Sequence, residues 1–308
     1  MRWIEVSVET KSGEIDALCA ALEALGVEGV CIEDETDFQA FLENNKQYWD
    51  YVDESLSSYY SGLSRIKFYL TDDEAGQKKL GAARQALNRE VAVSYVDDAD
   101  WENGWKENFP PLEIGKRLLV VPEWLEPEAN GRAVLRIEPG LAFGTGNHAT
   151  TRMCLEALKG MDVTEKKVLD LGCGSGILGL AALVLGAASV AGCDVDPKAP
   201  DAARGNAALN GITAERFRLY TGNILSDSGL RKKLGGGYDL VLANIVADVI
   251  LPLSGLLREF SAPEGLLICS GIIDDRAAEV EAALRKNKLQ ILRHLHEEEW
   301  HCYVLKIL

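Results

Sequence analysis

Hydrophobic and polar residues alternate from Trp3 to Val8, as they do in a half-buried β-strand. Apolar positions then recur three and four residues apart over 14–25 and 73–87, which predicts two amphipathic helices. The order strand, helix, strand, strand, helix, strand predicts a small ferredoxin-like α+β domain over residues 1–96. Short apolar runs mark its other strands, at 30–33, 65–70 and 91–96.

The second half of the chain alternates apolar runs of strand length with helix-forming stretches, which is typical of an α/β fold. A strand that ends at Leu171 leads into a glycine-rich turn, a helix over 177–185 and a second strand that ends in Asp194. This is the order of a βαβ nucleotide site, in which the acid accepts hydrogen bonds from ribose hydroxyls. We expect a Rossmann-like sheet, with further strands at 217–221, 238–243, 266–269, 289–294 and 302–307, the last two antiparallel.

The glycine turn alone does not decide which ligand binds. Gly174, Gly176 and Gly179 fit the dinucleotide pattern G-x-G-x-x-G, which is a weak signal. Asp170 precedes the turn, and its carboxylate would repel a pyrophosphate but suits a ligand with an ammonium group, such as S-adenosylmethionine. The run D-L-G-C-G-S-G resembles the first motif of class I methyltransferases. We therefore favour a methyltransferase, with a dinucleotide enzyme as the alternative.

Composition limits the compartment and the partners. The 308 residues suit two domains, and a formal charge of −16 argues against binding nucleic acid through its phosphates and favours a basic partner. The seven cysteines show no C-x-x-C spacing, which is typical of reduced thiols in a cytoplasmic protein, and we predict no metal site. The uncharged stretch 171–193 holds six glycines, so we predict no membrane span. We expect a cytoplasmic monomer.

Residues 1–96 carry more than half of the excess negative charge, with 18 acidic and 9 basic residues. They include a polar stretch, 38–60, that is rich in aromatic side chains and to which we assign no helix or strand. An acidic domain with exposed aromatics and no chemical motif suggests a recognition module for a basic protein.

A connector follows over 97–115, with two tryptophans and paired prolines that restrict the backbone. We expect it to pack against one of the domains. The second domain, 116–308, would begin with a hairpin of strands 118–124 and 133–137.

Five separate motifs stand out along the chain: E-P-G-L-A-F-G-T-G-N-H-A-T-T at 138–151, D-L-G-C-G-S-G at 170–176, C-D-V-D-P at 193–197, L-A-N-I at 242–245 and E-E-E-W at 297–300. Together they resemble one methyltransferase family, PrmA, whose members act on ribosomal protein L11 at the base of the large-subunit stalk. The loop F-G-T-G-x-H is much narrower in distribution than the glycine motif. Ala149 and Asn147 depart from the residues usual in the family, and we expect Thr150 and Thr151 to cap the helix after the loop.

The resemblance implies a protein N-methyltransferase that uses S-adenosylmethionine. Its substrate would be ribosomal protein L11, free or on the large subunit, at lysine side chains and, as a further candidate, the N-terminal amine. Little direct contact with nucleic acid is expected. The resemblance implies that Thr151, Gly172, Asp194 and Asn244 contact the methyl donor, S-adenosylmethionine. The motifs themselves add Phe143, Asp170 and Gly174 to this donor site.

Methyl transfer to lysine requires a neutral amine, and with an unperturbed pKa near 10.4 only about one lysine in a thousand is neutral near pH 7.4. An apolar site lowers this pKa without a dedicated base. We predict Asn244 as the catalytic residue that orients the amine, with His148 as a general base as the alternative. Two other function classes stay open: a small-molecule or nucleic-acid methyltransferase, and a catalytically silent protein that binds adenosylmethionine.

Overall fold

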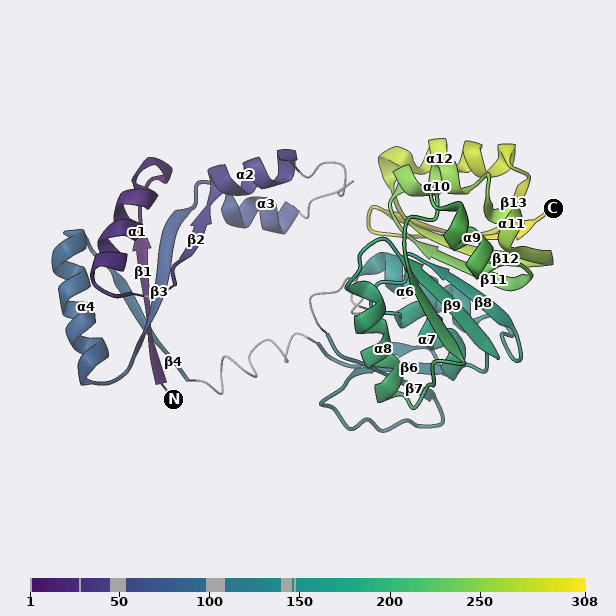
Figure 1. The fold of residues 1–308 in the computed structure, drawn as a ribbon, viewed down its shortest axis with the longest axis horizontal. Helices are drawn as coiled ribbons and strands as arrows, with labels where there is room; N and C mark the ends of the chain where they lie inside the picture. Colours follow the sequence, from purple (N-terminus) through teal and green to yellow (C-terminus); the bar gives the residue numbers. More distant parts are fainter. Residues whose placement is uncertain (1, 28, 45–53, 98–108, 140–145, 147) are drawn as a thin grey trace. The chain divides into compact units, whose positions relative to one another are not determined.

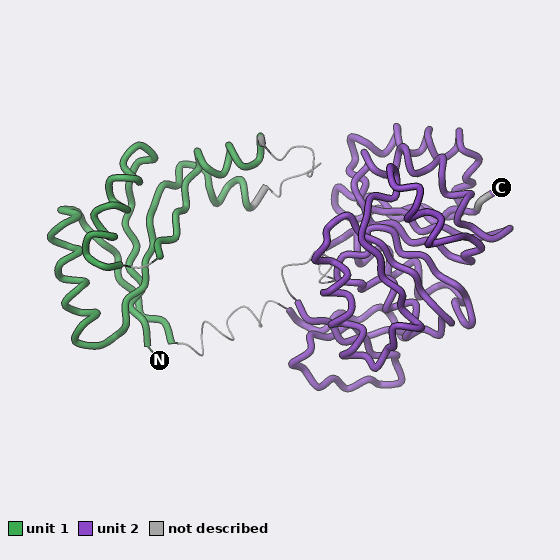
Figure 2. Tube along the Cα trace, in the orientation of Figure 1, with its two compact units in different colours: residues 1–108 green, residues 109–308 purple. Residues whose placement is uncertain are grey.

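The structure is a computed structural model that describes residues 2–27, 29–44, 54–97, 109–139, 146 and 148–308. The chain divides into two compact units, residues 1–108 and 109–308 (Figure 2). The expected connector, 97–115, crosses this division. Its residues 98–108, with both tryptophans, lie outside the described part, and residues 112–114 form a strand of the second unit.

The first unit is a four-stranded antiparallel sheet in the order β2-β3-β1-β4. Alternate residues of β1 and β3 are buried, among them Val6 and Phe68, and they pack against Leu22 and Leu80 of two helices. This order confirms the predicted ferredoxin-like domain. Its main elements are β1 (Arg2–Glu9), α1 (Ile15–Ala24), β2 (Cys31–Asp34), β3 (Ser64–Thr71), α4 (Glu74–Leu87) and β4 (Ala92–Asp97), with a short 3-10 turn at Ser12–Glu14.

Two further helices, α2 (Glu35–Asn44) and α3 (Glu54–Tyr60), lie largely within the stretch 38–60, to which the sequence analysis assigned no helix or strand. Phe38 stacks on Tyr60 with ring centroids 4.4 Å apart, so one aromatic pair joins the two helices. Phe41 and Tyr59 are about half exposed. In α2, Phe38, Phe41 and Leu42 do follow a helical spacing, but the element is short and lies in a polar, aromatic-rich stretch, so the sequence analysis assigned no helix there.

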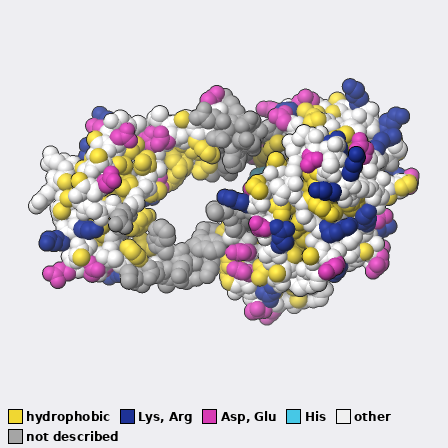
Figure 3. All heavy atoms as spheres, viewed as in Figure 1, with side chains coloured by type: hydrophobic (Ala, Val, Ile, Leu, Met, Phe, Trp, Pro, Cys, Tyr) yellow, Lys and Arg dark blue, Asp and Glu magenta, His cyan; other side chains and the backbone are white. Residues whose placement is uncertain are grey.

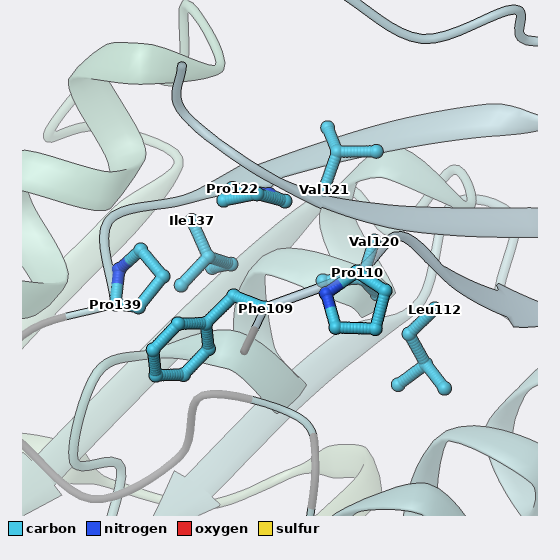
Figure 4. Close-up of a pocket in the computed structure, with 8 residues that line it drawn as sticks. All are labelled: Phe109, Pro110, Leu112, Val120, Val121, Pro122, Ile137 and Pro139. Carbon is cyan, nitrogen blue, oxygen red and sulfur yellow. The ribbon is translucent and has the colours of Figure 1, made fainter. Parts of the chain in front are cut away.

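The second unit begins with a small sheet of β5 (Leu112–Ile114), β6 (Leu118–Pro122) and β7 (Ala133–Ile137). The predicted hairpin is wrong, because β6 and β7 run parallel and β5 is the antiparallel neighbour of β6. The sequence pattern gives strand positions but not pairing direction, and the link over residues 123–132 carries the chain back without a helix. The connector was expected to pack against one of the domains, and its last, described part does so. Phe109 and Pro110 line a small apolar hollow over this sheet, with Leu112, Val120, Val121, Pro122, Ile137 and Pro139 (Figure 4).

A seven-stranded sheet forms the centre of the second unit, in the order β10-β9-β8-β11-β12-β14-β13. Only the pairs made by β14 are antiparallel. The predicted Rossmann-like sheet is confirmed, including its antiparallel last pair. The strands are β8 (Lys167–Leu171), β9 (Ser189–Asp194), β10 (Phe217–Thr221), β11 (Tyr238–Asn244), β12 (Ser261–Ile273), β13 (Leu289–Glu297) and β14 (Trp300–Ile307).

Helices cover both faces of this sheet (Figure 1). One face packs against α6 (Ala149–Lys159), α7 (Ile177–Val184) and α8 (Ala199–Leu209), which also contact the small sheet. The other face holds a buried cluster that includes Tyr238, Val241, Leu267 and Tyr303. Its helices are α9 (Ser228–Leu234), α10 (Ala247–Leu253), α11 (Leu257–Phe260) and α12 (Asp274–Lys286).

Charged groups of both signs are mixed on the surface of the second unit that faces the viewer in Figure 3. Among the described residues, no helix is both long and apolar enough to cross a membrane.

Candidate active site

The turn between β8 and α7 has a backbone that glycine accepts readily. Gly172, Gly174 and Gly176 have φ angles of 72°, 51° and 80°, in the left-handed region where other residues are strained. A Cβ atom on Gly172 would lie 2.2 Å from Cγ2 of Ile245, which directly follows β11. The turn therefore stands against the end of a neighbouring strand with no room for a side chain.

Asp194 holds this turn from the carboxyl end of β9. Its Oδ2 accepts a hydrogen bond from the backbone N–H of Gly174 at 2.8 Å, and its Oδ1 accepts one from the N–H of Asp196 at 3.0 Å. The side chain is half-buried. A carboxylate has about four acceptor sites, so the two backbone donors leave capacity for hydroxyl groups of a ligand.

Asp170 lies deeper than the sequence indicated. It is 1% exposed, and its Oδ2 accepts a hydrogen bond from the N–H of Gly179 at 2.9 Å. Burial raises the pKa of this carboxyl to about 7, the Gly179 bond opposes the rise, and the charge of Asp194 adds to it. The third glycine of G-x-G-x-x-G thus serves the packing of α7, because a Cβ at Gly179 would lie 3.0 Å from that carboxylate oxygen.

Asn244, the last residue of β11, is held by the first turn of α6. Its amide nitrogen Nδ2 donates to the hydroxyls of Thr150 and Thr151 at 3.2 and 3.3 Å. Both threonines are 1% exposed. With Nδ2 turned toward α6, the carbonyl oxygen of the same amide points away from those hydroxyls.

His148 is the N-cap of α6, so the expectation that the threonines cap this helix is wrong. The ring nitrogen Nδ1 accepts a hydrogen bond from the N–H of Thr150 at 3.3 Å and lies 2.8 Å from the Thr150 hydroxyl. Since that hydroxyl accepts from Asn244, it donates to Nδ1. Asn244, Thr150 and His148 therefore form one chain of hydrogen bonds.

The turn between β13 and β14 closes the site from the far end of the sequence. The Trp300 ring meets the His148 ring edge-on, with centroids 4.9 Å apart, and Nε of Arg152 lies 3.0 Å from Oε1 of Glu297. Both contacts fall on the first turn of α6. The motifs H-A-T-T, L-A-N-I and E-E-E-W, which are far apart in the sequence, thus meet at one end of the sheet.

Asn206 is a buried bridging residue that the sequence did not reveal. It lies in α8, is 2% exposed, and donates from Nδ2 to the carbonyl of Ser175 in the glycine turn at 2.9 Å. Its Oδ1 accepts from the N–H of Glu138 at 2.8 Å. Glu138 begins the loop motif, so one buried amide joins that motif to the turn. A lone asparagine within a helix gives no sequence signal of this role.

The structure places six of the seven predicted donor residues around these turns. Thr151 and Asn244 form one group, Gly174 and Asp194 form a second, and Gly172 lies against Ile245 next to Asn244. Asp170 lies beneath the turn. The seventh, Phe143, lies outside the described residues.

Comparison with known proteins gives consistent matches. A family model described as ribosomal protein L11 methyltransferase (PrmA) matches residues 2–307. The ribosomal protein L11 methyltransferase of Alkaliphilus metalliredigens (strain QYMF) is 36% identical over 319 residues, which cover 100% of this chain and 98% of that protein. The protein of the same name from Thermoanaerobacter pseudethanolicus is 35% identical over 317 residues, with 99% of each covered.

A solved structure of a ribosomal protein L11 methylase, from Lactobacillus delbrueckii subsp. bulgaricus, superposes with a TM-score of 0.57 at 34% identity. The match covers 64% of this chain and 99% of that one. These findings confirm the predicted resemblance: the chain belongs to the PrmA family of ribosomal protein L11 methyltransferases.

Proposed function

We propose that this chain is a protein N-methyltransferase that transfers methyl groups from S-adenosylmethionine to amines of ribosomal protein L11. The acceptors are lysine side chains and, as a further candidate, the N-terminal amine. The observation that carries the proposal is the meeting of three motifs beside the glycine turn, through Thr150, Asn244 and Trp300. The family match extends over both units of the chain.

The groups around the glycine turn fit S-adenosylmethionine. Gly172 and Gly174 leave backbone exposed to a close ligand, and the carboxylate of Asp194 suits the ribose hydroxyls. Asp170 supplies negative charge for the ammonium group, and Thr151 lies beside Asn244. When bound, S-adenosylmethionine supplies a methyl group on a positively charged sulfur, which an amine lone pair can attack. Phe143 remains part of the proposed donor site.

Asn244 is the proposed catalytic residue. Hydrogen bonds to two buried threonines fix its amide plane, so its carbonyl oxygen is already oriented before an acceptor arrives. That oxygen can accept an N–H of the incoming amine and turn the lone pair toward the methyl group. Preorganised contacts of this kind lower the barrier because they need no rearrangement during the reaction.

The contacts of His148 favour a positioning role over that of a general base. Its Nδ1 is already engaged by the backbone and hydroxyl of Thr150. The other ring nitrogen then carries the proton of the neutral ring. Neither nitrogen is therefore available to take a proton from an amine without breaking the N-cap of α6.

The two units are proposed to divide the work. Residues 1–96 would recognise the basic substrate, 97–115 would connect, and 116–308 would bind the donor and carry out the transfer. The half-exposed Phe41 and Tyr59 offer the first unit aromatic contact area, and its acidic excess attracts a basic protein. The proposal includes a monomeric, cytoplasmic enzyme that makes little direct contact with nucleic acid.

The test is methylation with labelled S-adenosylmethionine and three acceptors: free ribosomal protein L11, large subunits that carry it, and protein-free ribosomal RNA. We expect label in L11 and none in the RNA. Asp194→Ala is the control, because it removes charge-assisted hydrogen bonds worth about 1.5–3 kcal/mol each, and donor affinity should fall at least about tenfold. Label in RNA but not in L11 would refute the proposed substrate, whereas unchanged donor affinity in Asp194→Ala would refute the donor site.

A further inference from the structure

Three of the four histidines in the chain lie on one face of the β13–β14 hairpin. His296 stands directly opposite His301 in the antiparallel pair, and His294 stands opposite Tyr303. Side chains two residues apart on a strand share a face, and directly opposed residues have Cβ atoms about 4.5–5.5 Å apart. The register of this hairpin therefore brings the three imidazoles together.

Asp274, the first residue of α12, completes the group from another element. Its Oδ1 lies 2.8 Å from Nε2 of His296 and 2.6 Å from Nε2 of His301. The three potential ligand atoms all lie within 4.8 Å of one another. Asp274 and His296 are exposed and His301 is partly buried, so an ion from solution can reach all three.

We propose that Asp274, His296 and His301 form a binding site for a divalent transition-metal ion of the zinc class, which the sequence did not predict. Two imidazole nitrogens and one carboxylate oxygen are ligands that zinc uses at about 2.0–2.2 Å, with water completing a tetrahedron. The ion would take the position between the two Nε2 atoms and the carboxylate. Each imidazole binds in its neutral form, with the proton on its other nitrogen.

The surrounding groups support His301 as a ligand. Nε2 of His294 lies 2.7 Å from Nδ1 of His301, and the two rings stack with centroids 4.9 Å apart. A partner on the second ring nitrogen fixes the orientation and tautomer of a metal-binding histidine.

A bound ion would join two segments that border the donor site. Asp274 begins α12 directly after β12, and its backbone N–H donates to the carbonyl of Glu299 in the hairpin turn at 3.0 Å. The same turn supplies Glu297 and Trp300 to the first turn of α6. The site is therefore structural, and it does not depend on the proposed methyl transfer.

The experiment is calorimetric titration of the full chain with zinc chloride and with cobalt chloride near pH 7.5. We expect one ion per chain and, with cobalt, visible d–d absorption without an intense thiolate charge-transfer band. Zinc should also raise the melting temperature of the parent protein, because a ligand of the folded state stabilises it.

Variants assign the binding to these residues. His301→Ala and the nearly isosteric Asp274→Asn should abolish one-to-one binding and the zinc-dependent rise in melting temperature. His294→Ala should weaken binding about 10–100-fold, the usual effect of losing an outer-sphere partner. Cys31→Ser is the control, because Cys31 is an exposed thiol outside the proposed site and thiols attract zinc, and it should leave one-to-one binding unchanged. No uptake by the parent, or parent-like binding in both His301→Ala and Asp274→Asn, overturns the proposal.

Discussion

The buried carboxyl of Asp170 makes donor binding sensitive to pH. In the free protein its pKa is raised to about 7, mainly by burial, so the group is largely protonated below that pH. A cationic donor favours the ionised form, and its binding below pH 7 must therefore release a proton. The affinity for S-adenosylmethionine should rise as the pH increases from about 5.5 to 7, by at most about tenfold per unit, and then level off.

Calorimetry across this pH range, in buffers of different ionisation enthalpy, measures both the affinity and the released proton. Asp170→Asn keeps the shape of the side chain and an acceptor for the Gly179 N–H, but it has no proton to release. Above pH 7 the variant should bind S-adenosylmethionine more weakly than the parent does. Below pH 7 its affinity should not change with pH. A parent affinity that does not change with pH would show that the donor does not sense Asp170.

Asn244 and His148 should respond differently to replacement by alanine, although one hydrogen-bond chain joins them. Asn244→Ala removes the proposed contact to the attacking amine. A group that acts mainly in the transition state affects kcat more than binding, so turnover should fall at least about tenfold while donor affinity changes less. His148→Ala removes the cap of α6 and the ring contact with Trp300 but no proposed contact to the amine, so we expect a modest loss of rate and of stability, with about 1 kcal/mol from the cap.

The decisive measurement is turnover against pH for both variants at saturating donor. The His148→Ala profile should keep the shape of the parent profile. If the parent shows an ionisation between about pH 6 and 7 that disappears in His148→Ala, histidine is the base and the role given to Asn244 fails.

Single residues could be predicted from the sequence where local order alone fixes their place. Asp194 at the end of an apolar run and Gly172 in the turn after another run are of this kind. Asn206 as a bridge and the grouping of His296 with Asp274 depend on contacts across the fold, which no local pattern encodes. The His148 cap is a local contact with Thr150, but histidine is not among the preferred N-cap residues, so the sequence pointed to the threonines instead.

At the scale of elements, α8 links the loop motif to the glycine turn through Asn206. Asn206→Ala would leave the carbonyl of Ser175 and the N–H of Glu138 without this buried partner. Removing the two hydrogen bonds of a buried side chain costs about 0.5–1.5 kcal/mol each, so the free energy of unfolding should fall by at least about 1 kcal/mol. Donor affinity should fall with it, because the turn and the loop both lose a fixed position.

Asn210→Ala is the matched control one helical turn further along α8. Asn210 bonds the backbone N–H and carbonyl of Arg136 on β7, and within α8 its Nδ2 also donates to the backbone carbonyl of Asn206, but it does not touch the side chain that bridges the turn and the loop. Denaturant unfolding should show a similar loss of stability, while calorimetry should show unchanged donor affinity. Equal affinity losses in both variants would mean that α8 acts only through general stability.

Strand positions were predictable because buried strands read as short apolar runs, as β8 and β11 do. Pairing was predictable only where connections constrain it. The central sheet follows from repeated strand–helix units, whose crossovers are right-handed and place the strands parallel. Between β6 and β7 no helix intervenes, so a hairpin looked equally consistent with the pattern, yet the strands pair in parallel. In that arrangement β7 packs against α7 and α8, which are tertiary contacts that the local sequence does not encode.

At the scale of the molecule, each unit has its own buried core. The contrast between an acidic, motif-free first part and a motif-rich second part was visible in the sequence, because charge and motifs are local properties. The division of labour that we propose rests on this contrast. It also predicts that the attraction between enzyme and substrate is electrostatic, and hence that it weakens as salt concentration rises.

A shortened chain that begins at Phe109 tests that division. Every described residue of the proposed donor site lies in the second unit, so this chain should fold, as judged by circular dichroism, and should bind S-adenosylmethionine within about threefold of the parent. Because the acidic unit is gone, methylation of ribosomal protein L11 at low substrate concentration should fall at least about a hundredfold, which corresponds to about 2.7 kcal/mol of lost recognition. Raising the L11 concentration should restore part of the rate, since the transfer site itself is intact. If the shortened chain methylates L11 at micromolar concentration as fast as the full chain does, the first unit is not the recognition module.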